Sequence, residues 1–295
     1  MSKFTIVTDG SCDLPIGYAE EHGIKVLSIP LTVNGEDFTG DYKSFYASLR
    51  NGGTAKTSLI NPETFVESFT EYAKVGEDVL YLILSSGLSG TYQSSQIALS
   101  QVKDEYPDAK IFPIDSIAAT GLHGLLVMMA VQKRTEGATI EETAAFLEEK
   151  KQTLLAAFTV DDLMYLHRGG RLSKMSAIGG SLLNIKPVLN IQPDGTLQLK
   201  GKVRGRMAAL KTLVSKVERG LNPGTVIETA IIPHTDSEED ANKVAELLKA
   251  TGKVKNVHIV MMTPIIGAHV GPGAVAIVYT ADMTRAEYEE KFYKK

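Results

Sequence analysis

The chain has 295 residues, more than a single hydrophobic core usually organises, which favours two domains of ordinary size. Its 31 basic and 35 acidic residues give a formal charge of -4, so charge provides no general reason to expect nucleic acid binding. Cys12 is the only cysteine, which excludes an intrachain disulfide or cysteine zinc cage, and the six scattered histidines predict no metal or other cofactor.

The first half of the chain alternates short apolar runs with amphipathic stretches. The apolar runs predict strands at 4–9, 25–33, 78–85 and 109–115, and helices are predicted near 62–75, 91–106 and 118–135. Asn61 before Pro62 fits a helix start, and Thr139 with Glu142 has the spacing of a capping box. This alternation favours an α/β fold in which helices flank a mainly parallel sheet.

Paired glycines and clustered basic residues in DDLMYLHRGGRLSK break this rhythm, so we expect the domain transition near residue 160. The predicted division is an N-terminal α/β domain over 1–160 and a C-terminal α/β domain with a mixed sheet over 161–295. Within the second part we expect a short helix in SAIGGSLLNI, a hairpin at Asp194-Gly195, helices at 206–220 and 236–251, and strands at 225–234, 256–263 and 273–281.

No apolar run approaches the roughly 20 residues that a transmembrane helix needs, and no apolar signal segment follows Met1. We therefore expect a soluble cytoplasmic protein.

Four polar stretches follow predicted strands, where open α/β sheets bind ligands: 8–15, 57–62, 85–94 and 115–121. In SSGLSGTYQS, Gly87 and Gly90 permit tight backbone geometry, and Ser89 and Thr91 lie where the next helix begins. These hydroxyls either cap the helix or join its free N–H groups in binding an anion. This stretch lacks the spacing of a P-loop or a nucleophile elbow, and residues 9–13 after the first predicted strand lack the dinucleotide fingerprint.

Other polar residues have both a functional and a structural interpretation. His269, in a turn within AHVGPGAV, either donates to an anion or bonds a neighbouring carbonyl. Arg204 and Arg206 suit a carboxylate or phosphate but are also typical of a solvated surface. The segment HRGGRLSK is predicted to be an exposed basic loop, and Cys12 has no identifiable general base beside it.

Seven motifs occur together in order: TDGSCDLP, TSLINP, SSGLSGTYQS, DS at 115–116, LHRGGRLS, LLNIKPVL and HVGPGA. With them the chain resembles the DegV family over nearly its whole length. The resemblance implies a protein that encloses one long-chain fatty acid, with the carboxylate near the domain junction and the tail in an apolar tunnel. It also implies a partner, the catalytic subunit of a bacterial fatty acid kinase, which makes acyl-phosphate for phospholipid synthesis; this chain would not itself be an enzyme.

The head-group residues that the resemblance implies are Thr57, Ser58, Ser89, Gly90, Arg204 and His269. Arg206 competes with Arg204 for the arginine position. Two motifs depart from the family pattern, because Gly10 replaces the usual serine after Asp9 and the TSQP motif is TSLINP here, so the entrance loops are expected to differ.

Two other function classes remain open from the sequence. One is a hydrolase or phosphotransferase that uses the Ser, Asp and His residues on a lipid-like or phosphorylated small molecule. The other is a lipid-dependent regulator whose loop around Arg168 and Arg171 meets another protein. The glycine-interrupted SAIGGSLLNI segment would either contact the membrane transiently or cover the core.

Overall fold

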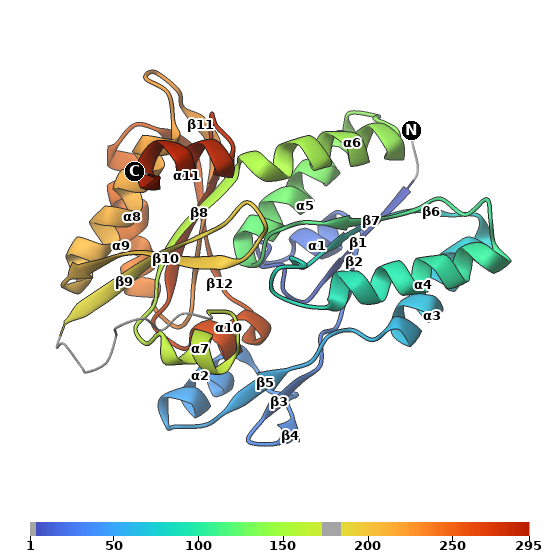
Figure 1. The fold of residues 1–295 in the computed structure, drawn as a ribbon, viewed down its shortest axis with the longest axis horizontal. Helices are drawn as coiled ribbons and strands as arrows, with labels where there is room; N and C mark the ends of the chain where they lie inside the picture. Colours follow the sequence, from blue (N-terminus) through green and yellow to red (C-terminus); the bar gives the residue numbers. More distant parts are fainter. Residues whose placement is uncertain (1–3, 173–183, 295) are drawn as a thin grey trace.

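The computed structural model describes residues 4–172 and 184–294. Its first layer is a four-stranded sheet, in the order β2-β1-β6-β7, with every neighbouring pair parallel (Figure 1). The strands are β1 (Phe4–Asp9), β2 (Ile24–Leu27), β6 (Asp78–Ile83) and β7 (Ile111–Asp115). Helices flank both faces of this sheet, so the predicted α/β fold is confirmed.

Side chains alternate between the two faces of the sheet, as strand geometry requires. On β6, Val79, Tyr81 and Ile83 pack with α3 (Pro62–Val75) and α4 (Thr91–Glu105). Leu80 and Leu82 point the other way, towards α5 (Thr120–Thr135) and α6 (Ile140–Lys150). The burial of both faces explains why this strand reads as an unbroken apolar run.

A six-stranded mixed sheet forms the second layer, in the order β10-β9-β8-β13-β11-β12. Its strands are β8 (Leu154–Thr159), β9 (Ile185–Ile191), β10 (Leu197–Arg204), β11 (Ile227–His234), β12 (Val254–Met261) and β13 (Val275–Thr280). Helices α8 (Arg206–Gly220) and α9 (Glu238–Ala250) cover one face, and α11 (Arg285–Tyr293) packs beside them. The opposite face meets α5, which therefore lies between the two sheets (Figure 1).

A small third unit closes one side of the junction, at the lower edge of Figure 1. It contains a three-stranded sheet of β3 (Leu31–Val33), β4 (Glu36–Asp37) and β5 (Ala55–Thr57), with helix α2 (Tyr42–Arg50). Two short helices lie beside it, α7 (Met164–Arg168) and α10 (Pro264–Val270), while α1 (Tyr18–Glu21) precedes β2. This unit brings residues near 57, 165 and 269 together.

Two expectations about local structure are wrong. The single strand predicted at 25–33 is divided into β2 and β3, which belong to different sheets. Pro30 lies in the break, where its lack of an N–H group interrupts strand pairing. His269 is not in a turn but in the last turn of α10, before Gly271 at a φ of 70°.

Helix starts follow their local signals closely. Asn61 caps α3 by accepting a hydrogen bond from the Thr64 N–H group, and Thr139 forms a complete capping box with Glu142.

The strand β8 was not predicted. It belongs to the mixed sheet and ends at Thr159, next to the expected domain transition near residue 160. If the chain is divided according to its two main sheets, the boundary therefore falls before Leu154. The predicted SAIGGSLLNI helix lies largely outside the described residues. Among the residues that the structure describes, no helix combines the length and apolarity needed to cross a membrane.

Candidate ligand-binding site

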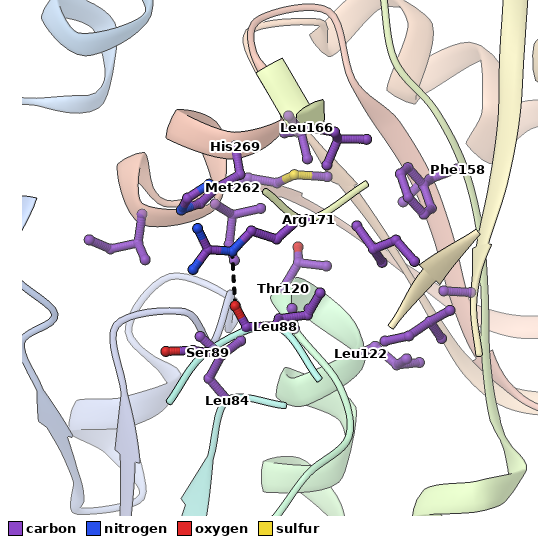
Figure 2. Close-up of a pocket in the computed structure, with 18 of the residues that line it drawn as sticks. Leu84, Leu88, Ser89, Thr120, Leu122, Phe158, Leu166, Arg171, Met262 and His269 are labelled. Atoms are coloured by element: carbon purple, nitrogen blue, oxygen red, sulfur yellow. Dashed lines mark hydrogen bonds between the residues drawn. The ribbon is translucent and has the colours of Figure 1, made fainter. Parts of the chain in front are cut away.

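A cavity lies at the junction of these layers, between the carboxyl end of the parallel sheet and the inner face of the mixed sheet. Its walls come from the turn after β6, the start of α5, strands β8, β9 and β13, and helices α7 and α10. Most of the lining is aliphatic or aromatic, including Leu122, Phe158, Leu166 and Met262, which Figure 2 shows around the space. Such a lining suits a hydrocarbon group.

Polar side chains gather at one end of the cavity. Thr57 is the last residue of β5 and Ser58 follows it, Ser89 lies in the turn after β6, and His269 comes from α10. The hydroxyl of Thr57 is hydrogen-bonded to Nε2 of His269 at 2.7 Å, although 212 positions separate these residues in the sequence. The cavity is therefore amphiphilic, with hydroxyl and imidazole groups at one end of an apolar space.

Arg171 supplies a positive charge at this polar end. Its Nε donates to the carbonyl of Leu88 at 2.9 Å (Figure 2). Its guanidinium also donates to the carbonyl of Gly169. No aspartate or glutamate lines the cavity, and within residues 4–172 and 184–294 no carboxylate is paired with Arg171. An anion bound here would meet a cation whose charge is not yet compensated.

His269 is neutral in this environment. Burial, together with the charge of Arg171, lowers the pKa of His269 to about 4. No described residue provides a hydrogen-bond partner for its buried Nδ1 atom. The backbone of Gly169 packs against this atom, since an added Cβ on Gly169 would lie 2.5 Å from Nδ1. Since no carboxylate orients this ring and its pKa is so low, the Thr57–His269 pair is poorly suited to general base catalysis.

Ser89 lies beside the helix start rather than capping it. Gly90 is the N-cap residue of α4, and no side chain makes the usual capping bond there. The Ser89 hydroxyl is hydrogen-bonded to the Thr91 hydroxyl at 2.9 Å and accepts from the Thr91 N–H group at 3.3 Å. Apart from the bond between Ser89 and the Thr91 N–H group, no described side chain caps the first turn of α4, which lies next to the polar end of the cavity.

The predicted site residues separate into two groups. Thr57, Ser58, Ser89 and His269 line the cavity, and Gly90 adjoins it as the N-cap of α4. Arg204 is not among the lining residues; it lies exposed at the end of β10.

Arg206 also lies outside the cavity lining, and its guanidinium binds other groups of the protein. It donates to the Asp240 carboxylate at 2.7 Å and to the carbonyl of Gly273 at 2.7 Å. Neither arginine of the KVRGR segment therefore supplies the charge at the polar end.

As it stands, the cavity is narrow, with a volume of about 100 Å³. A cavity of about 150 Å³ holds one benzene ring, so a long acyl chain requires the lining side chains to move apart. Flexible residues such as Leu88 and Met262 suit this movement.

The sequence matches the family model described as "Uncharacterised protein, DegV family" over residues 3–282. The chain belongs to the DegV family. A DegV domain-containing protein of Clostridium perfringens, CPE0026, is 39% identical over 289 residues, covering 96% of this chain and 99% of the relative.

Solved structures of other proteins share the fold. The fatty acid binding DegV family protein SAG1342 of Streptococcus agalactiae is 28% identical, with a TM-score of 0.83 over 96% of this chain and 100% of that one. A stearic acid-binding protein of Eubacterium ventriosum is 26% identical, with a TM-score of 0.81 over 97% and 99% of the two chains.

Arg171 lines the cavity, although the sequence did not place it among the predicted site residues. It was expected in an exposed basic loop, whereas the structure turns it into the cavity. The signal was the preceding Gly169-Gly170 pair: Gly170 adopts a φ of 73°, and Gly169 allows the close approach to His269.

Proposed function

We propose that this DegV protein binds a long-chain fatty acid, with the carboxylate at Arg171, Thr57 and Ser89 and the acyl chain among the apolar residues. The observation that carries this proposal is Arg171, which lies at the polar end of a mainly apolar cavity and has no carboxylate partner among the described residues. The relatives from Streptococcus agalactiae and Eubacterium ventriosum, described as fatty acid-binding and stearic acid-binding, support the same ligand class.

The two ends of the ligand contribute differently to the free energy of binding. Burying each methylene contributes ~0.8 kcal/mol, so the tail supplies most of the gross affinity. A charge-assisted hydrogen bond adds about 1.5 to 3 kcal/mol net, and it fixes which end of the lipid enters first. An uncharged ester would leave Arg171 uncompensated and is therefore rejected.

Neutral His269 acts through Thr57 in this proposal. With a proton on Nε2, the imidazole donates to the Thr57 oxygen, and the Thr57 proton is then free to donate to the carboxylate. Its role is to position that hydroxyl.

We further propose that the bound carboxylate is presented to a separate ATP-dependent kinase in the cytoplasm, for phospholipid synthesis. A carboxylate oxygen attacks the γ-phosphorus of ATP, the bond to the β,γ-bridging oxygen breaks, and its electron pair leaves with ADP. The low basicity of His269 favours this division of labour over a hydrolase that acts by itself.

Native mass spectrometry of protein loaded with palmitate tests the site. We expect Ser89→Ala and Arg171→Ala each to lower lipid affinity about tenfold, because each removes one donor to the carboxylate. Ser100→Ala, on the exposed side of α4, is the matched control and should retain lipid as wild type does. Wild type should also discriminate against methyl palmitate, and Arg171→Ala should lose this preference.

Arg204→Ala separates the two candidate arginines. Because Arg204 is exposed outside the cavity, we expect this variant to keep its lipid and to slow phosphorylation by the kinase. Release of lipid by Arg204→Ala, with retention by Arg171→Ala, would show that the assignment of the carboxylate site is wrong.

A further inference from the structure

A wide groove of about 930 Å³ lies beside the lipid cavity, and Ile29 and Ile265 line both spaces. In the described structure β2 and β12 are the outermost strands of the two main sheets. Val26 of β2 and residues 259–261 of β12 line the groove, so it runs between two sheet edges. Among residues 4–172 and 184–294 no strand other than β11 pairs with β12, so the outer backbone groups of β12 have no strand partner.

Apolar side chains that line this groove are exposed to solvent. Ile16 is fully exposed, and Val26 and Tyr42 are 45% and 40% exposed. Single exposed apolar side chains are common on protein surfaces and need no explanation. Several of them in one groove, beside an unpaired strand edge, are instead typical of a surface that binds another polypeptide.

The charged residues that line the groove are all acidic. They are Asp13, Glu20 and Asp37, and none of the lysines, arginines and histidines that the structure describes lines this space. Asp13 is bound within the protein, since it accepts from the Thr263 N–H group at 2.7 Å and from the Thr120 hydroxyl. Glu20 and Asp37 are exposed, and neither carboxylate is paired with a described cation. A ligand that complements the groove therefore carries positive charge.

These features favour an extended basic polypeptide over other occupants. An extended chain pairs with the edge of β12 through its backbone, and its alternate side chains face opposite directions. Apolar side chains on one face then pack against Ile16, Val26 and Tyr42. Basic side chains on the other face lie nearer the carboxylates of Glu20 and Asp37. An anionic membrane or a free fatty acid would instead meet carboxylates of its own sign of charge.

We propose that this groove is a docking site for an extended segment of a partner protein in which apolar and basic residues alternate. The segment adds a strand to the outer edge of β12. The inference goes beyond the proposed function, because no step of it requires a lipid in the cavity. It assigns to this chain a protein-binding surface in addition to its ligand site.

A fluorescein-labelled hexapeptide of three Val-Lys repeats tests the docking site by fluorescence anisotropy with the full chain. We expect wild type to bind it about tenfold more tightly than a peptide of three Val-Glu repeats. Ile16→Ser, and the double variant Glu20→Gln with Asp37→Asn, should each weaken binding about tenfold. Val75→Ser and Glu63→Gln, at exposed positions of α3 outside the groove, are the matched controls and should bind as wild type does.

Methylation of the peptide backbone tests the strand pairing separately. In an extended chain only alternate N–H groups face the neighbouring strand. Methylating one set, either the three valine or the three lysine nitrogens, should therefore abolish binding, while methylating the other set should leave it unchanged. Equal effects of the two methylated peptides would overturn the pairing with β12.

Urea unfolding and palmitate binding of each variant should match wild type, which separates a lost docking site from a misfolded chain. Equal affinity for the lysine and glutamate peptides, or unchanged binding in every groove variant, overturns the proposal. If Ile16→Ser changes only the oligomeric state in sedimentation velocity, the groove contacts a second copy of the chain and the proposal is wrong. If the groove variants lose only binding to phosphatidylglycerol vesicles, the groove serves a membrane and the proposal is equally wrong.

Discussion

The charged groups at the polar end of the cavity influence one another at the level of single residues. Arg171 has only carbonyl partners among the described residues, and its charge adds to the effect of burial on His269. A bound carboxylate would oppose both effects by placing negative charge beside the ring. The protonation of His269 is therefore linked to folding and to the ligand.

The pH dependence of stability tests this residue. Because its pKa is lowered to about 4 from 6.5, His269 stays neutral in the folded protein between these values, where the unfolded chain protonates it. The unfolded state then binds more protons, so the His269 contribution to the free energy of unfolding falls as the pH falls from 6.5 to 4. The slope approaches ~1.4 kcal/mol per pH unit at most. We expect His269→Asn to reduce this slope in urea unfolding of ligand-free protein.

Asp13 contributes a slope of the opposite sign, because burial raises its pKa to about 7 from 3.8. In this case the folded state binds more protons, and the contribution falls as the pH rises through that window. Asp13 is common to wild type and His269→Asn, so the difference between their pH profiles isolates His269. His258→Asn, on β12, is the control, and identical profiles for wild type and His269→Asn would contradict the assignment.

At the level of elements, the β9–β10 hairpin supports the turn that carries Ser89. The hydroxyl of Ser85 donates to the Gly195 carbonyl at 3.0 Å, and an added Cβ on Gly87 would lie 2.7 Å from the Asp194 carbonyl oxygen. The predicted hairpin signal at Asp194-Gly195 is confirmed by antiparallel pairing of the two strands. The sequence did not indicate that this hairpin tip packs against the glycine-rich turn.

Substitution of Gly195 tests that contact. Gly195 has a φ of 78°, and its added Cβ would collide with the Ser85 hydroxyl and lie 3.1 Å from the Ile117 Cα. Gly224→Ala is the matched control, since Gly224 has a φ of 88° and no atom within 4 Å of an added Cβ. Both variants lose ~1 kcal/mol of stability because alanine, unlike glycine, disfavours a left-handed backbone conformation. We expect Gly195→Ala to lose ~2 kcal/mol more in thermal or urea unfolding and to weaken palmitate binding; equal losses would contradict the packing role.

At the level of the whole molecule, Arg285 joins the two main sheets. It is fully buried, and it donates to the Leu154 carbonyl of β8 at 2.8 Å and to the Ile117 carbonyl after β7 at 2.6 Å. Burial lowers the pKa of Arg285 to about 9, with Asp115 and Asp194 opposing the shift, so the group stays charged at neutral pH. This buried cation therefore links the two layers between which the cavity lies.

We expect Arg285→Met to lose about 3 kcal/mol or more in free energy of unfolding, because buried carbonyls of both layers would lose their donor. Arg219→Met, on the exposed side of α8, is the control and should change stability by less than ~0.5 kcal/mol. Urea unfolding followed by circular dichroism measures both variants. A loss in Arg285→Met no larger than in the control would contradict the linking role.

The sequence by itself determined the α/β class, the order of most strands and helices, and the polar turns around the cavity. These features depend on local patterns, such as the Asn61 cap before α3 and the buried run of β6. The strand β8 was missed because a short apolar run next to a helix carries little periodicity.

Only the tertiary structure decided which cation faces the cavity. Arg171, Arg204 and Arg206 have similar local surroundings of glycine and basic residues, so their side chains could not be distinguished from the sequence. Arg206 is paired with Asp240, Arg204 is exposed, and Arg171 turns inward beside His269. The reason is physical: contacts such as the one between Thr57 and His269 join distant parts of the chain, and they depend on how the layers pack.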